Sequence, residues 1–310
     1  MTGKHPALPP THLLLAVAVA AVWGTNFVVI KVALAHLPTL LLAALRFTLA
    51  FLPAAFFLKR PAVRWTNLAA YGVVIGAGQF GLLYLAMETS ISPGLASLVI
   101  QTQVFFTIGL AMWISRERLR GFQWLALTLG GAGLALIALR GGATATPLGL
   151  GLVLAAAACW ASGNLLARAG GPQNMLAYVV WASLFSFPPL FVLSLVFEGW
   201  PAIRSGLAHS DWVTWSAVLY QSLANTLFGY ASWGWLLARH PAATISPVAL
   251  LVPVFGMSTS ALLLAEPMPA WKLGATLLVM SGLALNLAWP RLRQRIARPT
   301  ARARDPDQGR

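Results

Sequence analysis

Long runs of apolar residues follow one another along almost the whole chain, and short polar segments separate them. A run of about 20 apolar residues is long enough to cross a bilayer as an α-helix, which rises about 1.5 Å per residue. The pattern therefore predicts about ten transmembrane helices. They are expected at residues 13–35, 39–58, 67–87, 94–114, 122–139, 148–168, 174–197, 212–238, 242–264 and 271–289.

The second half of the chain repeats features of the first half. Residues 23–27 read WGTNF, and residues 160–165 read WASGNL. A shift of about 149 residues aligns further positions: Tyr71 with Tyr220, Tyr84 with Trp233, Glu117 with Glu266, and 133–136 with 282–285. Because the repeated unit holds five helices, an odd number, its second copy must lie upside down in the bilayer. We therefore expect an all-α integral membrane protein of ten transmembrane helices, built as two inverted five-helix repeats at residues 1–140 and 141–290.

Composition agrees with a membrane protein. Hydrophobic residues make up 58% of the 310 and charged residues 9%, and the mean hydropathy is +0.75. A chain of this kind cannot divide itself into an apolar core and a polar surface. The first apolar run is too long for the core of a signal peptide, so we expect it to be a retained helix. The single cysteine, Cys159, excludes an intramolecular disulfide.

Positive charge indicates how the helices are oriented. One set of loops carries Lys4, Lys59, Arg60, Arg64, Arg116, Arg118, Arg120, Arg168, Arg239 and the tail arginines, whereas the other set carries Arg140, Arg204 and Lys272. Cytoplasmic loops are the richer in Lys and Arg. We therefore expect a multi-pass protein of the cell (inner) membrane with both termini in the cytoplasm. The basic tail, residues 291–310, is expected to contact anionic lipids, and no nucleic-acid binding is expected despite the net charge of +14.

Several short sequence motifs of the chain resemble those of a known family. They are residues 23–31, the pair Arg46 and Phe47, residues 230–233 and 241–243, Pro253, Glu266, Gly274 and Gly282. Together they resemble the EamA family of the drug/metabolite transporter superfamily, and within it the YddG-like exporters of aromatic and other amino acids. The resemblance covers nearly the whole chain. It implies a ten-helix exporter of small metabolites, commonly amino acids, with both ends in the cytoplasm.

Polar side chains fall near the middle of several predicted spans, where they are costly unless they face a cavity or another helix. Five of them are amides, and two tryptophans lie at a similar depth: Asn26, Gln79, Gln101, Asn164, Asn225, Trp23 and Trp160. We expect this set to line a substrate cavity, to which Tyr84 and Tyr230 add rings suited to apolar side chains. The alternative is that each amide simply bonds one helix to another.

Two cations and four prolines have further predicted roles. Lys31 and Arg46 are the cations that lie more than two residues from either end of a predicted span, and they are expected at the outer mouth. There they would attract a carboxylate, or else reach headgroups and cap backbone carbonyls. Pro93, Pro241, Pro247 and Pro253 are expected to bend helices 4 and 9 at gates.

The chemistry of the chain narrows the function classes. Its five histidines are scattered, no acidic residue lies in mid-span, and no nucleophile has a nearby base. We therefore expect no metal, no cofactor and no enzymatic activity. A proton-coupled exporter of lipophilic cations needs a buried carboxylate. The expected substrate is thus a small neutral or zwitterionic metabolite, most of all an amino acid. Alternative substrates are another small metabolite or a drug, such as a nucleoside, a sugar or an amphiphile. A membrane-embedded enzyme, a receptor or a channel is a weaker alternative to a transporter. The sequence does not indicate an oligomeric state.

Overall fold

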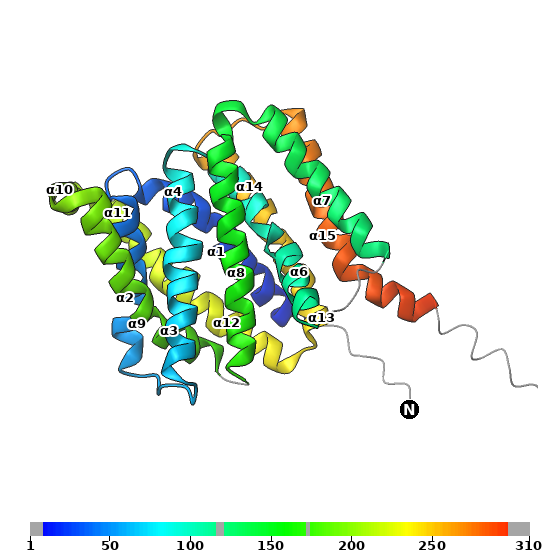
Figure 1. Ribbon diagram of the computed structural model, residues 1–310, viewed down its shortest axis with the longest axis horizontal. Coiled ribbons are helices and arrows are strands. Elements are labelled where there is room, and N and C mark those ends of the chain that lie inside the picture. Colours follow the sequence, from blue (N-terminus) through cyan, green and yellow to red (C-terminus); the bar gives the residue numbers. More distant parts are fainter. Residues whose placement is uncertain (1–8, 116–120, 172–173, 297–310) are drawn as a thin grey trace, which may run out of the picture.

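The computed structural model describes residues 9–115, 121–171 and 174–296. Within these residues the chain forms ten helical rods and one further short helix (Figure 1). The rods of the first half are α1 (Pro10–Ala33), α2 (Thr39–Ala55), α3–η1–α4 (Trp65–Val73, Val74–Gly81, Leu82–Thr89), α5–η2–α6 (Pro93–Val99, Ile100–Thr102, Gln103–Ser115) and α7 (Gly121–Arg140).

A short turn, η3 (Gly142–Thr144), leads into the second half. Its rods are α8 (Pro147–Ala169), α9–η4 (Met175–Leu193, Ser194–Glu198), α11–η5–α12 (Trp212–Leu219, Tyr220–Phe228, Gly229–Arg239), α13–η6–α14 (Ala242–Ile245, Ser246–Leu250, Leu251–Leu263) and α15 (Ala270–Ile296). The additional helix, α10 (Gly199–His209), links the seventh rod to the eighth.

Length and composition suit these rods to a bilayer. Eight helical segments of the described chain are long and apolar enough to span a membrane, and Thr39–Ala55 is a shorter apolar helix. The remaining rod, residues 212–239, is more polar because η5 buries Gln221, Ser222, Asn225 and Thr226 inside the bundle. Large apolar side chains such as Phe56, Phe57 and Leu262 are exposed on the outside of the bundle, where lipid would cover them. The predicted all-α membrane fold is confirmed.

The helix pairs show a two-fold arrangement of the halves. Rods 2 and 7 pack together as α2 and α9, and rods 5 and 10 pack as α7 and α15. The packing of α1 on α14 is matched by that of α8 on α6. The end of α1 and the start of α8 both meet the end of α4: Lys31 Nζ donates to Glu88 O at 2.7 Å, and Thr146 N donates to Ser90 O at 2.9 Å. The equivalent rods α1 and α8 therefore run in opposite directions, as an inverted repeat requires.

Irregular helix recurs in matching rods of the two halves. The third and eighth rods contain π-helical stretches, η1 and η5, and the fourth and ninth rods contain 3₁₀ stretches, η2 and η6. Such interruptions in the middle of a helix often mark functional positions. Here η1, η2, η5 and η6 lie in rods that surround the centre of the bundle. The outer pair, α7 and α15, contains no such stretch among the described residues.

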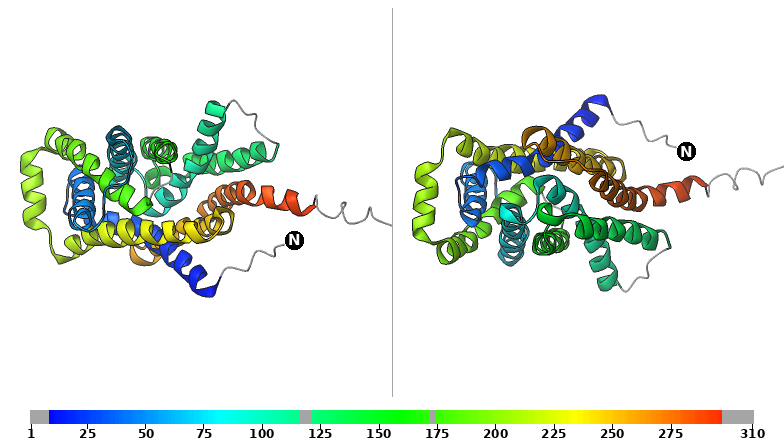
Figure 2. Two further views of the ribbon diagram at one scale, coloured as in Figure 1. Left: turned by 90° about the horizontal axis from the view of Figure 1, so that it is seen from below. Right: turned by 90° about the horizontal axis from the view of Figure 1, so that it is seen from above.

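Three details differ from the sequence prediction. First, α10 was expected to be a loop; its packing surface is limited to Ile203 and Gly206 on one face, and Figure 2 shows it at the edge of the bundle opposite the α7–α15 pair. Second, α15 continues to Ile296, into the segment expected to be tail. Third, helices 3, 4, 7, 8 and 9 are not uniformly α-helical. The predictions for Lys4, Arg116, Glu117, Arg118, Arg120 and residues 297–310 lie outside the described residues.

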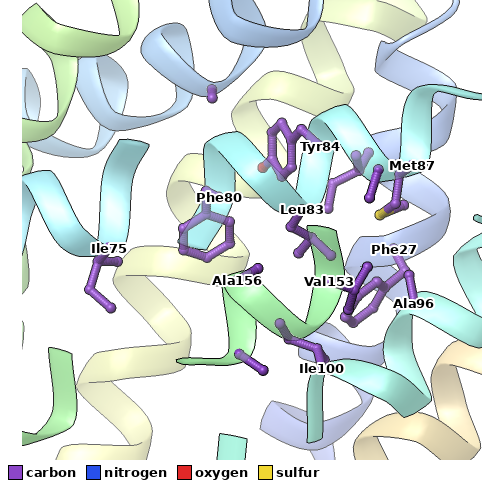
Figure 3. Packing of buried hydrophobic residues seen from close by; sticks show 14 of the residues in the cluster. Phe27, Ile75, Phe80, Leu83, Tyr84, Met87, Ala96, Ile100, Val153 and Ala156 are labelled. Atoms are coloured by element: carbon purple, nitrogen blue, oxygen red, sulfur yellow. The ribbon is translucent and has the colours of Figure 1, made fainter. Parts of the chain in front are cut away.

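Close glycine contacts set the spacing of several rods. A Cβ added to Gly24 of α1 would lie 2.5 Å from Val252 O and 2.6 Å from Phe255 Cβ of α14. A Cβ added to Gly72 of α3 would lie 2.2 Å from Ala182 O of α9. Around these crossings the apolar core is continuous, and Figure 3 shows its layer between η1–α4 and α8, where Leu83 lies beside Val153 and Ala156.

Candidate functional site

A buried arginine stands at the centre of the bundle. Arg46 projects from α2 and is 1% exposed. Its Nη1 donates a hydrogen bond to the Tyr84 hydroxyl at 3.0 Å, and its Nη2 donates to Thr226 Oγ1 at 3.2 Å. The guanidinium carbon lies 3.8 Å from the centre of the Phe80 ring, which is close enough for a cation–π interaction. Both halves of the chain thus hold this one cation.

Neutral groups fix the arginine in place. The Tyr84 hydroxyl donates a hydrogen bond to Gln221 Oε1, and Thr226 Oγ1 donates to Gln221 O at 2.9 Å. Ser222 Oγ donates to the backbone oxygen of Arg46 at 3.0 Å. Three of the four polar residues buried in η5 therefore face α2 and α4, which explains why this rod is polar at mid-length.

A small cavity lies beside the guanidinium, with a volume of about 10 Å³, about enough for one water molecule. Its walls come from α2, α3, η1, α9, η5 and α12. The lining residues are Arg46, Phe47, Tyr71, Ile75, Phe80, Val179, Ala182, Ser183, Ser186, Thr226 and Tyr230. Aromatic rings and hydroxyls dominate, and no carboxylate is among them. In this conformation the centre of the bundle is nearly closed, so a metabolite could enter only after the rods move apart.

The structure brings some of the predicted site residues to this centre. Tyr230 lines the cavity, and Tyr84 bonds the arginine. Trp23 packs against Tyr230, with ring centres 5.9 Å apart, and its Nε1 donates to Asn225 O at 3.0 Å. Trp23 thus connects α1 to the rod of Asn225 and Tyr230, next to the cavity.

Other predicted residues lie elsewhere. Gln101 donates to Ala249 O at 3.3 Å, and Asn164 donates to Gln103 Oε1 at 3.3 Å, so both amides bond one rod to another. Trp160 is half-buried against the apolar core. Asn26 and Gln79 are 4% and 3% exposed, and the side-chain oxygen of each has no partner among the described residues. The cavity-lining role of this set stays a prediction.

The two predicted cations occupy different layers. Lys31 Nζ donates to Met87 O at 3.1 Å and to Glu88 O at 2.7 Å, so it caps the C-terminal end of α4, where a helix favours positive charge. The surrounding rods bury Arg46 completely, so in this conformation its guanidinium is not open to solvent. Its place at the outer mouth stays a prediction.

The predicted prolines are divided between helix starts and helix interiors. Pro93 is in the first turn of α5 and Pro241 directly precedes α13, so each begins a helix, as suits a residue without an N–H. Pro247 lies in the 3₁₀ stretch η6, and Pro253 lies buried inside α14. The ninth rod is thus interrupted near Pro247 and Pro253, and its role as a gate stays a prediction.

An ion pair that the sequence did not reveal closes one end of the bundle. We call this the α10 end; the turns after α1, α4, α7 and α14 gather there (Figure 1). Lys272 Nζ donates to Glu266 Oε1, and both side chains are buried, 1% and 7% exposed. Glu266 also accepts hydrogen bonds from Ser92 Oγ and, at 3.0 Å, from Gly94 N in the first turn of α5. Burial by itself would raise the pKa of the Glu266 carboxyl, but these hydrogen bonds hold it below the ordinary value.

Two further contacts join the halves at the α10 end. Ser92 N donates to Thr144 O at 2.9 Å, which ties the turn after α4 to the turn after α7. Glu198 accepts hydrogen bonds from the backbone N–H groups of Leu40 at 2.6 Å and Leu41 at 3.2 Å, so it caps α2 from the second half. The α10 end is therefore held shut by hydrogen bonds and by one ion pair. In the described part of the chain, no group of three or more side chains could hold a metal ion.

Comparison with known proteins gives a consistent result. The EamA-like transporter family matches residues 11–139 and 147–288. A probable amino-acid metabolite efflux pump of Salmonella typhimurium is 40% identical over 286 residues, covering 90% of this chain and 96% of the relative. A protein of the same description from Escherichia coli is 39% identical over 290 residues, with coverage of 91% and 96%. A probable terminal-alkyne amino-acid exporter of Streptantibioticus cattleyicolor is 27% identical, with coverage of 85% and 89%.

A solved crystal structure has the same fold. It is 18% identical, covers 93% of this chain and 100% of its own, and superposes with a TM-score of 0.61. The fold and these relatives support a multi-pass inner-membrane exporter of small molecules rather than an enzyme. Since the family match covers both halves of the chain, the protein belongs to the EamA-like transporter family.

Proposed function

We propose that this protein exports small neutral or zwitterionic metabolites, amino acids including aromatic ones above all, by alternating access. The observation that carries the proposal is the cavity between the two halves. Phe47, Phe80, Tyr71 and Tyr230 surround it with rings that suit an apolar side chain, and hydroxyls and one cation supply the polar contacts. Two relatives described as probable amino-acid metabolite efflux pumps, and one described as a probable terminal-alkyne amino-acid exporter, support this choice of substrate.

Alternating access requires that one end of the bundle opens while the other closes. The described conformation is closed at the α10 end, by the Glu266–Lys272 ion pair and by the bonded turns. The π-helical and 3₁₀ stretches in the middle of rods lie in rods 3, 4, 8 and 9, so these are the rods that we expect to move. The polar midplane set, with Asn26 and Gln79 each keeping an unpaired oxygen, would then meet the substrate in other conformations.

We expect both termini to be cytoplasmic, with the α10 end facing outward. Reporter fusions after His36, Glu88, Arg140, Trp200 and Glu266 should all report the outer side, because the loops between these positions carry most of the arginines and lysines. Fusions after Leu58 and Arg168 serve as matched controls and should report the cytoplasm. A cytoplasmic signal at two or more of the first five sites would contradict this orientation.

Transport is expected to follow the gradient of the solute itself. A buried carboxylate is what couples cation export to protons, and the acidic side chains of the described rods lie at their ends. Liposomes loaded with tryptophan or methionine should therefore release the amino acid at a similar rate with and without an imposed pH gradient. Efflux that requires the gradient would contradict the prediction. Transport of sugars, nucleosides or quaternary amines with no amino-acid flux would contradict the proposed function.

The remaining partners follow from the membrane setting. The bilayer surrounds the rods, and the basic segment after α15 is proposed to contact anionic headgroups. Most of that segment, from residue 297 on, lies outside the described residues. We propose neither a cofactor nor a nucleic-acid partner.

A further inference from the structure

Arg46 carries a positive charge for which the bundle provides no counter-ion. The described part of the chain has four acidic residues, and each lies away from the guanidinium: Glu88, Glu198, Asp211 and Glu266. The ion pair of the described residues is the one between Lys272 and Glu266. An isolated charge in a membrane protein interior is expensive, and such residues mark functional sites.

The charge cannot be removed by deprotonation. Arginine keeps its proton in proteins, unlike a buried lysine or histidine. Its present partners, the hydroxyls of Tyr84 and Thr226 and the Phe80 ring, orient the guanidinium without neutralising it. Within the described part of the chain no acidic group neutralises this charge, so a bound anion is the partner that the guanidinium can take.

The guanidinium also has spare hydrogen-bonding capacity. It has five N–H donors, and Nε has no partner although the side chain is completely buried. A carboxylate can accept two parallel hydrogen bonds from such a fork. The adjoining cavity provides rings from α2, η1, α3 and α12 for the rest of the ligand.

We propose that Arg46 is the binding site for the carboxylate of the transported solute. This proposal rests on the proposed function and deepens it: the substrates are carboxylates with an apolar or aromatic side chain, of which zwitterionic amino acids are the clearest case. Tyr84 and Thr226 position the guanidinium, and Phe80 covers one face of it. Amino-acid amides and the corresponding decarboxylated amines lack the charge that Arg46 requires.

The first test compares solutes in wild-type protein. Proteoliposomes are loaded with methionine, methionine amide or methioninol, and efflux of each is measured. Losing one charge-assisted hydrogen bond weakens binding, so methionine should leave at least ten times faster than either analogue, a ratio that corresponds to about 1.4 kcal/mol. Methionine should also raise the unfolding temperature of the detergent-solubilised protein, since a ligand stabilises the state that binds it, and the amide should not.

The second test changes the residue. Arg46→Gln should reduce methionine efflux by about tenfold and leave the residual rates of methionine and its amide equal. Arg46→Lys keeps the charge without the fork and should retain an intermediate preference. Lys31→Gln is the matched control, because its ammonium contacts only the backbone oxygens of α4, and it should keep the full preference.

The outcomes separate the two proposals. If wild-type protein exports no amino acid, the proposed function fails. If it exports methionine and methionine amide equally well, only the carboxylate site is wrong, whether or not the Arg46 variants fold. If export of the amide depends on chloride and stops when chloride is replaced by a bulky sulfonate, Arg46 binds an inorganic anion instead, which also overturns the carboxylate proposal.

Discussion

Replacing Lys272 with methionine is expected to lower the free energy of unfolding by about 3 kcal/mol, because breaking a buried ion pair by removing one partner leaves an uncompensated charge. The Glu266 carboxylate would remain buried with Ser92 Oγ and Gly94 N as its neutral donors. Denaturant titration in mixed micelles measures the change. Because the pair joins α15 to the start of α5, the variant should also expose the α10 end to thiol reagents. A cysteine placed at Thr144, whose backbone oxygen accepts from Ser92 N, reports this in a protein whose native Cys159 is replaced by alanine.

Two further variants test whether the Glu266–Lys272 pair contributes more to the free energy of unfolding than an ordinary surface contact does. The double variant Glu266→Gln/Lys272→Met removes both charges and should recover at least half of the loss, since a neutral amide can still accept from Gly94 N. Lys31→Met, at the same end of the bundle, loses only hydrogen bonds to backbone oxygens and should cost about 1 kcal/mol. Equal losses for Lys272→Met and Lys31→Met would contradict the prediction.

Acid provides an independent check on the same pair. The pKa of Glu266 is lower in the folded protein than its ordinary value, so the unfolded chain binds the proton more tightly. The stability that the pair provides is therefore fully present above about pH 4.3, the ordinary value for glutamate, and is lost as the pH falls through the folded-state pKa. The Glu266→Gln variant should lack this part of the acid dependence.

Local patterns were sufficient to predict the rods. A stretch such as 148–168 is apolar at almost every position, so its length alone identifies a span, and the structure gives Pro147–Ala169. The inverted repeat was also accessible, because Tyr71 and Tyr220 occupy matching positions in rods 3 and 8. The helix α10 was missed because its composition is that of a loop. Its one available signal was the spacing of Ile203 and Gly206, which lie on the same helix face.

The centre of the site was less predictable, since it depends on contacts between distant segments. Phe47 and Phe80 are two of 15 phenylalanines, and nothing in their local sequence distinguishes the rings that cover Arg46. The burial of Arg46 was not predicted, because counting residues from the helix end ignores what covers that end. Lys272 was assigned to a loop, yet it lies buried one turn into α15, six positions after Glu266.

A methyl group added at Gly24 is expected to be the most disruptive small change in the first rod. Its Cβ would lie 2.5 Å from Val252 O and 2.9 Å from Gly256 N, and backbone atoms cannot rotate away as a side chain can. The rods α1 and α14 would have to move apart at a crossing that also includes Ser97, because Gly256 packs on the β-carbon of that residue. Overpacking of this kind typically costs about 1–3 kcal/mol. We expect Gly24→Ala to reach the upper end of that range.

Gly131→Ala is the matched control for this variant. Gly131 also lies in an α-helix, α7, and a Cβ there would meet no other atom within 4 Å. Alanine is favoured over glycine in a helix by about 1 kcal/mol, so this substitution should leave stability unchanged or raise it slightly. Fluorescence-detected size-exclusion chromatography and unfolding temperature compare the two variants in one detergent. Both variants add the same methyl group to a helical glycine. A lower yield and a lower unfolding temperature for Gly24→Ala alone would therefore report the close α1–α14 contact. Equal behaviour of the two variants would mean that this crossing is looser than the structure describes.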